Sequence, residues 1–313
     1  MSKPDQSVTP MMAQFLEIKE GYPSALLFYR MGDFYELFFD DAVAAAQALD
    51  ITLTKRGKHQ GADIPMCGVP VHAAEGYLLN LIRKGFRVAV CEQLENPQEA
   101  KKRGAKSVVK RGVVRLVTPG TLTEDTLLHP RESNFLASFV QVRNQSCLSW
   151  VDISTGDLRY SPCPPVRLGP ELARLAPAEV LVAEGASNEF LEIIQESGAA
   201  ATELPQDVFD SSAGADKICK AYGVGDLGSL GEFGRADIAA ISGLIEYLST
   251  TQKGQLPLLR RPVCEARDDF VAIDAATRKN LELTQTLSGE RSGSLLSVVD
   301  RSVTAAGARL LSR

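Results

Sequence analysis

No stretch of the sequence reaches the roughly 18 consecutive apolar residues that a membrane-spanning helix needs, so no membrane span is expected. The first residues, Met-Ser-Lys-Pro-Asp-Gln-Ser, lack the apolar core of a secretory signal, which makes the cytoplasm the expected location. Charged residues make up 23% and apolar residues 44% of the 313 residues, which is close to the averages of soluble globular proteins and excludes wholesale disorder. At roughly 100 to 200 residues per domain, this length predicts two or three domains.

Cysteine and histidine are scarce, and their spacing is not that of a metal site. There is no Cys-x-x-Cys and no nearby histidine pair, although zinc ligation needs such close spacing. His59 and His129 have no obvious partner, so a cysteine or serine hydrolase with a histidine base is not indicated. We expect no metal site, and we expect the cysteines to be small buried apolar residues. The cysteines are Cys67, Cys91, Cys147, Cys163, Cys219 and Cys264.

The chain also lacks the phosphate-binding loop G-x-x-x-x-G-K-[ST], which excludes ATP binding at such a loop within these residues. Gly223-Val-Gly225-Asp-Leu-Gly228 matches the dinucleotide pattern G-x-G-x-x-G. That pattern should follow a strand, whereas here it follows the helix-like segment Asp216–Tyr222. We interpret it as a glycine-rich linker.

Charge is distributed unevenly along the chain. The net charge is +1 over residues 1–129, −9 over residues 130–250 and +3 over residues 251–313. Lys101–Arg115 carries seven basic residues and no acid, a pattern suited to contacting nucleic-acid phosphates, with a solvated basic loop as the alternative. The acidic middle segment is a poor DNA surface and is better suited to a connector or to docking another protein.

The first part of the chain predicts an α/β domain. Ala25–Phe39 contains two apolar-aromatic strands joined through Gly32, which is a hairpin signal. The Ala-rich segment Asp40–Asp50 predicts a helix, and residues 54–58 predict a basic loop. Apolar residues at helical spacing follow over Ala74–Ile82. Further strands are expected at Phe86–Val90 and Val113–Val117.

A strand meander opens the second predicted domain. Helix, strand and helix follow it, which favours an α/β domain of the ribonuclease-H-like kind over residues 130–252. The three strands are expected at Phe135–Val142, Cys147–Ile153 and Leu158–Tyr160, and the later elements at Glu171–Leu175, Glu179–Ala183 and Ser187–Gly198.

The remaining residues predict helices. Asp274 is expected to cap a helix that runs to Gly289. Asp300–Arg313 is typical of a helix still under way, with no capping glycine or proline beyond it, so we expect the chain to be cut there.

Two aspartates of the meander raise a catalytic alternative. Asp152 and Asp157 could hold magnesium ions for phosphodiester cleavage on a ribonuclease-H-like fold. No further carboxylates of such a site are identified, and Asp157 follows Gly156 in an expected turn. A structure-specific nuclease therefore remains the alternative function.

The segment Gly32–Phe38 is the most unusual of the chain. Because side chains alternate along a strand, Phe34 and Glu36 should share one face, with Tyr35 and Leu37 on the other. Taken alone, this aromatic-carboxylate pair is also typical of a core strand with one solvated glutamate.

A series of short segments carries a recognisable pattern along the chain: Thr9–Met12, Leu27–Phe38 (LFYRMGDFYELF), Leu53–Arg56, Ile64–Pro70 (IPMCGVP), Val90–Gln93 and Val117–Thr121 (VTPGT). In order and spacing, these segments closely resemble the N-terminal part of the bacterial MutS family of DNA mismatch recognition proteins. The resemblance continues through Asp152–Gly156 and Asp274–Leu281, so it covers essentially the whole chain.

The resemblance implies a mismatch-recognition domain over residues 1–116, a linker over 117–129, a connector domain over 130–252 and the truncated start of an all-α core and lever domain over 253–313. Its implied partner is double-stranded DNA with mismatches or small loops, in a protein of the cytoplasm associated with the nucleoid. The family's clamp and ATPase domains are absent, so this fragment is expected to be no enzyme and to hold no cofactor. ATP, magnesium, the homodimer and a MutL-type repair partner belong to the full-length family.

The resemblance also assigns residues. The family's Phe-x-Glu motif falls on Phe34, as the wedge that stacks beside the mispair, and on Glu36, as its hydrogen-bonding partner. Lys55, Arg56 and His72 are candidate contacts to the DNA backbone, with a solvated surface as the alternative. Together these expectations predict a protein that recognises mismatched or looped-out bases to initiate mismatch repair.

Overall fold

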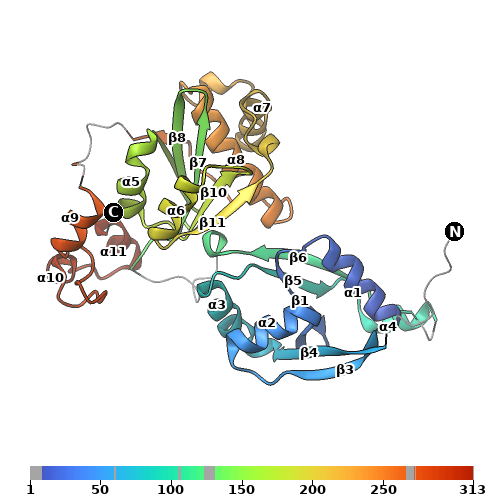
Figure 1. Cartoon of the computed structure of the whole chain (residues 1–313). Coiled ribbons are helices and arrows are strands. Elements are labelled where there is room, and N and C mark those ends of the chain that lie inside the picture. Colours follow the sequence, from blue (N-terminus) through green and yellow to red (C-terminus); the bar gives the residue numbers. More distant parts are fainter. Residues whose placement is uncertain are drawn as a thin grey trace. The chain divides into compact units, whose positions relative to one another are not determined.

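The computed structural model describes residues 9–59, 61–104, 107–122, 131–265, 271 and 273–312. Two compact units make up the chain (Figure 1): Met1–Pro119 with Thr251–Lys253, and Gly120–Thr250 with Gly254–Arg313. Each unit contains a six-stranded mixed sheet, which confirms the predicted α/β class. Among the described residues, no helix is long and apolar enough to cross a membrane.

The sheet of the first unit has the strand order β3-β4-β2-β1-β5-β6. Only β1 and β5 run parallel; the other neighbours are antiparallel. The predicted hairpin is confirmed as β1 and β2, and Gly32 in its turn has a φ of 60°, a conformation that favours glycine. The strands are β1 Leu26–Met31, β2 Phe34–Phe38, β3 Thr54–His59, β4 Ala62–Pro70, β5 Val88–Gln93 and β6 Arg111–Val117.

Helices cover both faces of this sheet. The ring of Phe15 in α1 meets those of Tyr29 and Phe38 edge-on, with centroids 5.5 and 5.0 Å apart. On the opposite face, the Cys67 Sγ lies 3.4 Å from the Ala42 carbonyl oxygen of α2. The predicted helices at residues 40–50 and 74–82 are confirmed as α2 and α3. The helical segments are α1 Pro10–Glu20, α2 Phe39–Leu49, α3 Ala74–Arg83, α4 Pro97–Lys102 and the 3-10 turns η1 Val71–Ala73 and η2 Pro119–Thr121.

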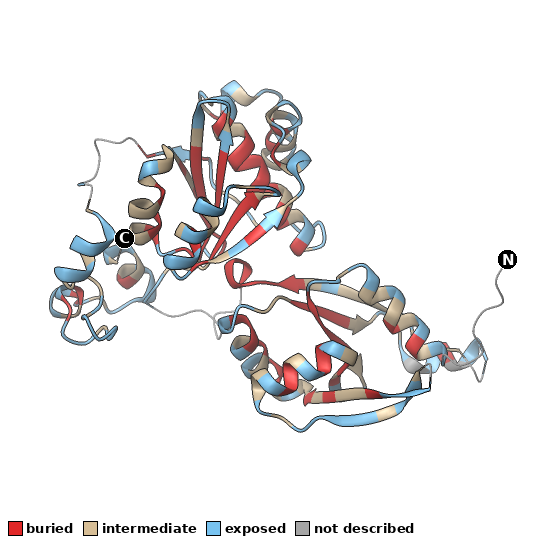
Figure 2. Ribbon diagram, in the orientation of Figure 1, coloured by how far each residue is buried: buried red, intermediate tan, exposed pale blue. Residues whose placement is uncertain are grey.

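The prediction of a basic loop at residues 54–58 is wrong. This segment is the edge strand β3, which pairs with β4 through a register shift between Lys55 and Lys58. Figure 2 shows that β3 is largely exposed, so ladder hydrogen bonds rather than burial hold it in place. Strand β4 was not predicted because it contains two prolines and a glycine, residues that are depleted in strands.

The sheet of the second unit has the order β11-β10-β7-β8-β9-β12. Strands β7, β8 and β9 form the predicted antiparallel meander, and β10 runs parallel to both β7 and β11. Antiparallel strands followed by parallel ones agree with the predicted topology, although β11 and β12 were not predicted. The strands are β7 Phe135–Val142, β8 Gln145–Asp152, β9 Asp157–Pro162, β10 Glu179–Ala183, β11 Ala200–Leu204 and β12 Val263–Cys264.

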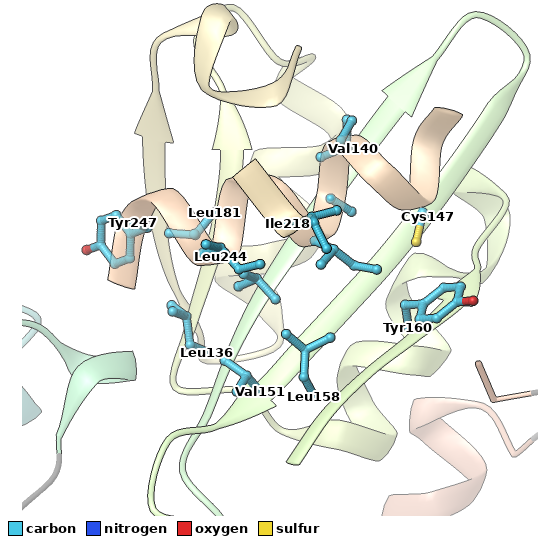
Figure 3. Packing of buried hydrophobic residues seen from close by; sticks show 14 of the residues in the cluster. Leu136, Val140, Cys147, Val151, Leu158, Tyr160, Leu181, Ile218, Leu244 and Tyr247 are labelled. Carbon is cyan, nitrogen blue, oxygen red and sulfur yellow. The ribbon is translucent and has the colours of Figure 1, made fainter. Parts of the chain in front are cut away.

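Each face of this second sheet has its own hydrophobic core. On one face, Leu136 and Leu158 of the sheet pack with Ile218 of α7 and Leu244 of α8 (Figure 3). On the other face, Trp150 belongs to a cluster with residues of α5 and α6. The helical segments are η3 Pro165–Arg167, α5 Leu168–Leu175, α6 Asn188–Glu196, η4 Gln206–Phe209, α7 Ser211–Tyr222, η5 Leu227–Ser229 and α8 Arg235–Thr251.

Glu179, at the start of β10, is fully buried and fixes the beginning of the second unit. Its carboxylate accepts hydrogen bonds from the Gly120 N–H at 2.9 Å, the Thr202 hydroxyl at 2.6 Å and the Tyr247 hydroxyl at 2.7 Å. A Cβ on Gly120 would lie 2.7 Å from a Leu136 methyl carbon and 2.9 Å from the Glu179 Cβ. Glycine is therefore required at this position.

Two sequence patterns that suggested chemistry have structural roles. Gly223 ends α7 with a left-handed φ of 64°, so the G-x-G-x-x-G match follows a helix and not a strand, as expected for a linker. Four of the six cysteines are buried, as expected of core residues, whereas Cys219 is half-buried and Cys264 is exposed, so the expectation is wrong for Cys264. His129 lies outside the described residues.

The last described residues form three short helices, α9 Ala275–Asn280, α10 Leu295–Val299 and α11 Ala305–Leu311. Asp274 caps α9 as predicted, accepting a 2.9 Å hydrogen bond from the Thr277 N–H. The helix does not reach Gly289, because Glu282 adopts a left-handed φ of 46°. The start of an all-α core domain remains a prediction, since the described residues of this segment form no long helix.

The predicted helix over residues 300–313 begins later than expected. Thr304 caps α11 and accepts a hydrogen bond from the Gly307 N–H at 3.1 Å. Asp300 instead accepts hydrogen bonds from Arg131 at 2.7 Å and Arg291 at 2.6 Å. Its carboxylate therefore holds two arginines in place and does not belong to the helix.

Candidate nucleic-acid interface

Strand β2 presents Phe34 and Glu36 on the same face of the first sheet. Phe34 is 48% exposed, and Glu36 is half-buried two residues further along. Tyr35 and Leu37 point to the opposite face and are buried. The predicted alternation is thus confirmed, and it leaves an aromatic ring accessible to solvent next to a carboxylate.

Gly68 lies beside this pair, on the neighbouring strand β4 and in register with Glu36. A Cβ built on Gly68 would lie 3.8 Å from the Glu36 Cγ and 3.9 Å from the Phe34 Cδ1. The lack of a side chain therefore keeps the surface between Phe34 and Glu36 open. Sequence reasoning missed this role, although a glycine inside a strand often marks the close approach of a ligand or another backbone.

Arg56 of β3 forms an ion pair with Glu36, in which its Nη1 donates to the Glu36 Oε2. The Glu36 side chain is 15% exposed and that of Arg56 is 40% exposed. The structure therefore brings together two residues that the sequence suggested for different tasks, one for the base and one for the DNA backbone.

The other candidate backbone contacts lie around these residues. Lys55 donates to Asp63 at 2.9 Å, and this hydrogen bond raises the pKa of the lysine. His72 is exposed in η1, two residues beyond Pro70, which pairs with Phe34. Among the described residues, neither side chain forms a hydrogen bond or ion pair with Glu36.

Arg111 supports the hairpin from the face that carries Phe34. Its Nε donates to the Arg30 carbonyl oxygen at 2.7 Å, and its guanidinium lies 4.9 Å from the centre of the Tyr29 ring. Its Nη2 also lies 3.3 Å from the sulfur of Met31, the residue that pairs with Phe34. These contacts fix the end of β1 directly before the turn that leads to Phe34.

Tyr35 holds β2 from the opposite face. Its ring stacks on Phe28 with centroids 5.5 Å apart, and the Arg30 guanidinium lies 5.5 Å from its centre. Its hydroxyl donates to Glu92, which Arg30 approaches to 3.7 Å. The pKa of Tyr35 is raised to about 12, mainly because the side chain is buried and secondly because its hydroxyl donates a hydrogen bond to Glu92. No local sequence pattern indicates this network, because its members come from different strands.

The basic run 101–115 is not a single free patch. Arg103 donates to Glu95, a contact that lowers the pKa of Glu95 to about 2. Arg111 contacts β1 as described, and burial lowers the pKa of Arg115. Lys102 and Lys110 are exposed, whereas Lys106 lies outside the described residues.

The two candidate nuclease carboxylates are engaged in local structure. Asp152 and Asp157 are cross-strand partners, but Asp152 is only 3% exposed and accepts from the Ser154 N–H and hydroxyl at 3.0 and 2.6 Å. Asp157 accepts from Arg159 at 3.2 Å. No cluster of three or more His, Cys, Asp or Glu that could hold a metal occurs in the described part of the chain. A nuclease is therefore not favoured.

Two family models match the chain. The one described as MutS domain I matches residues 9–126, and the one described as MutS domain II matches residues 134–260. The first range contains Phe34, Glu36 and all three candidate backbone contacts.

Curated relatives match almost the whole chain. A protein of Dinoroseobacter shibae named DNA mismatch repair protein MutS is 66% identical over 308 residues, which cover 98% of this chain and 35% of that protein. Proteins of the same name from Roseobacter denitrificans and Paracoccus denitrificans are 64% and 66% identical, over 98% and 97% of this chain and 35% and 34% of their own lengths. The chain thus spans about a third of the length of these relatives.

Proposed function

The chain belongs to the MutS family, and from this membership we propose that its first unit binds mismatched or looped-out bases in duplex DNA, as the step that initiates DNA mismatch repair. The observation that carries the proposal is the half-exposed ring of Phe34 beside the half-buried carboxylate of Glu36 on one face of β2. Apolar side chains of this kind can enter the minor groove and unstack a base step.

Phe34 acts as the wedge. Unstacking one step and kinking the duplex requires a few kcal/mol, and less where the pairing is already defective. The protein therefore reads how easily the DNA deforms, which explains how one site can accept many mismatches and small loops. Arg111 and Tyr35 support this role, because they hold the β1–β2 hairpin from opposite faces. The backbone that carries Phe34 therefore stays in place when the ring meets stacked bases.

Glu36 adds discrimination. Its carboxylate accepts a hydrogen bond from the edge of a base that the wedge has displaced, whereas the same negative charge is repelled by the phosphates of any duplex. A paired and stacked base offers no compensation for this repulsion. Lys55, Arg56 and His72 contact the backbone of a mismatched duplex and hold it against the wedge.

The remaining activities belong elsewhere in the full-length protein. We assign ATP hydrolysis with magnesium, and the homodimer contacts, to the two thirds or so of the relatives' length that this chain does not match. The fragment itself acts without a cofactor and without catalysis. The acidic second unit is the candidate docking site for a MutL-type partner, and the protein works on the nucleoid in the cytoplasm.

The proposal is tested by fluorescence anisotropy of the full-length protein at fixed moderate salt. A duplex with one G·T mismatch is compared with its fully paired twin, and tighter binding of the mismatched duplex is expected. Equal affinity for the two would contradict the proposal. Magnesium-dependent cleavage of either duplex that is lost on Asp152→Asn would favour the nuclease instead.

A further inference from the structure

The ion pair between Glu36 and Arg56 joins the base-reading carboxylate to a cation that could otherwise reach a phosphate. We infer that Arg56 is a specificity-determining residue whose contact with the DNA backbone is conditional: Glu36 retains Arg56 on a paired duplex, and releases it to a phosphate only when a mispaired base takes the hydrogen bond of Glu36. This inference rests on the proposed function. It assigns to Arg56 a contact with the DNA backbone that depends on the state of the base pair and is not the same on every duplex.

The burial of the two side chains indicates which of them moves. Glu36 lies in a central strand and is 15% exposed, so without a partner its carboxylate would be an unpaired, mostly buried charge. Arg56 lies in the edge strand β3, is 40% exposed and has the longer side chain. Arg56 can therefore turn toward solvent or DNA, provided that another donor replaces it at Glu36.

The neighbouring residues leave space for this replacement. Strand β4 lies between β3 and β2, and its residue in register with Glu36 is Gly68. A Cβ on Gly68 would contact both Glu36 and Phe34, so its absence leaves the carboxylate open beside the wedge. A base displaced by Phe34 would therefore reach the Glu36 carboxylate, which Arg56 contacts in the absence of DNA.

The exchange makes the backbone contact depend on the state of the base pair. On matched DNA the bases stay stacked, no donor reaches Glu36, and the ion pair persists. On mismatched DNA a base edge takes over the carboxylate, and the guanidinium becomes free to form a forked, charge-assisted contact with a phosphate. The mismatch thereby gains two interactions, one at the base and one at the backbone.

The salt dependence of binding tests this idea, because each phosphate that a cation neutralises adds about 0.9 to the slope of log K against log salt. We expect the wild-type slope to be steeper by about that amount for the G·T duplex than for its matched twin. In Arg56→Met the two slopes should coincide, with roughly tenfold weaker binding of the mismatched duplex and unchanged binding of the matched one. In Glu36→Gln, Arg56 is free on both duplexes, so the matched duplex should bind more tightly and with the steeper slope.

Lys55→Met is the matched control. Lys55 lies on the same strand in an ion pair with Asp63 that does not involve Glu36, so its removal should affect both duplexes equally. If Arg56→Met leaves Glu36 too poorly solvated for folding, Arg56→Met combined with Glu36→Gln removes the unpaired charge. That double variant should show the shallower slope on both duplexes.

The inference is overturned if Arg56→Met lowers affinity and slope equally on both duplexes, or changes neither. If the wild-type protein still prefers the G·T duplex, either of these outcomes rejects only the conditional contact of Arg56 and does not contradict the proposed function. Loss of the wild-type preference itself would reject the proposed function. Thermal unfolding of every variant shows whether the fold is retained.

Discussion

Replacing Phe34 by alanine separates the contribution of this side chain to folding from its contribution to DNA binding. Fully burying a phenylalanine stabilises a protein by about 1.5–3 kcal/mol. Phe34 is 48% exposed, so roughly half of that burial is realised, and its removal should lower the free energy of unfolding by only about 1 kcal/mol. The contacts of Arg111 and Tyr35 that hold the hairpin remain in the variant.

The effect on binding should be larger. Stacking of a base on an aromatic side chain contributes about 1–3 kcal/mol by alanine substitution, which corresponds to roughly 5- to 150-fold in affinity. Because matched DNA does not accept the wedge, this loss should fall on the G·T duplex alone. Phe34→Ala should therefore bring the two affinities together.

The assay is fluorescence anisotropy of the full-length protein with both duplexes, beside urea unfolding of each variant. Val43→Ala is the matched control, since Val43 is 44% exposed and belongs to α2, which packs on the face of the sheet opposite Phe34. Val43→Ala should keep the mismatch preference. A Phe34→Ala protein that folds and still prefers the G·T duplex by the wild-type factor would refute the wedge assignment.

Three further changes test other parts of the structure. Gly120→Ala should lower the free energy of unfolding, measured by urea titration, by about 1–3 kcal/mol, because the added methyl group would overlap buried neighbours that cannot move away. Gly225→Ala is the control and should leave the free energy of unfolding unchanged, since the space around Gly225 is open. Equal losses of stability in the two variants would contradict this explanation. Burial raises the pKa of Tyr35 from 10.0 to about 12, so the protonated Tyr35 stabilises the fold fully below pH 10, and this contribution is lost as the pH rises toward 12. Tyr35→Phe should therefore reduce the loss of thermal stability between pH 10 and 12. An unchanged loss of stability over this range would argue against the reasoning. Lys102→Gln with Lys110→Gln should reduce the salt slope of DNA binding equally on matched and mismatched duplexes if these exposed lysines touch phosphate, and an unchanged slope would exclude that contact.

Local signals were sufficient for the elements whose pattern matches their burial. The hairpin with Gly32 in its turn and the buried strand Glu179–Ala183 both agree with the structure. They were predictable because strand-forming residues coincide there with turn residues at the boundaries. The Phe34 and Glu36 alternation followed from the same periodicity.

The failures have a common physical cause. Strand β3 is polar and exposed, and β4 contains prolines, so neither has the apolar pattern that predicts a strand. They form because each provides the other's hydrogen-bonding partner, which is a tertiary effect. The helix after Asp274 was predicted too long, since nothing in the local pattern signals the left-handed backbone of Glu282.

The same limitation affects the candidate site, and it indicates how the site works. Residues 34 and 36 are neighbours in sequence, whereas Arg56 reaches Glu36 only because the β3–β4 hairpin folds back beside β2. The hairpin that sequence reasoning missed is therefore the element that delivers the cation to the carboxylate. An edge strand held mainly by its ladder can shift more easily than the interior strand β2, which Tyr35 holds from one face and whose hairpin partner β1 is held by Arg111 from the other. The fold thus places a rigid wedge and a fixed carboxylate on β2, and places the charge that must move on the strand best able to release it.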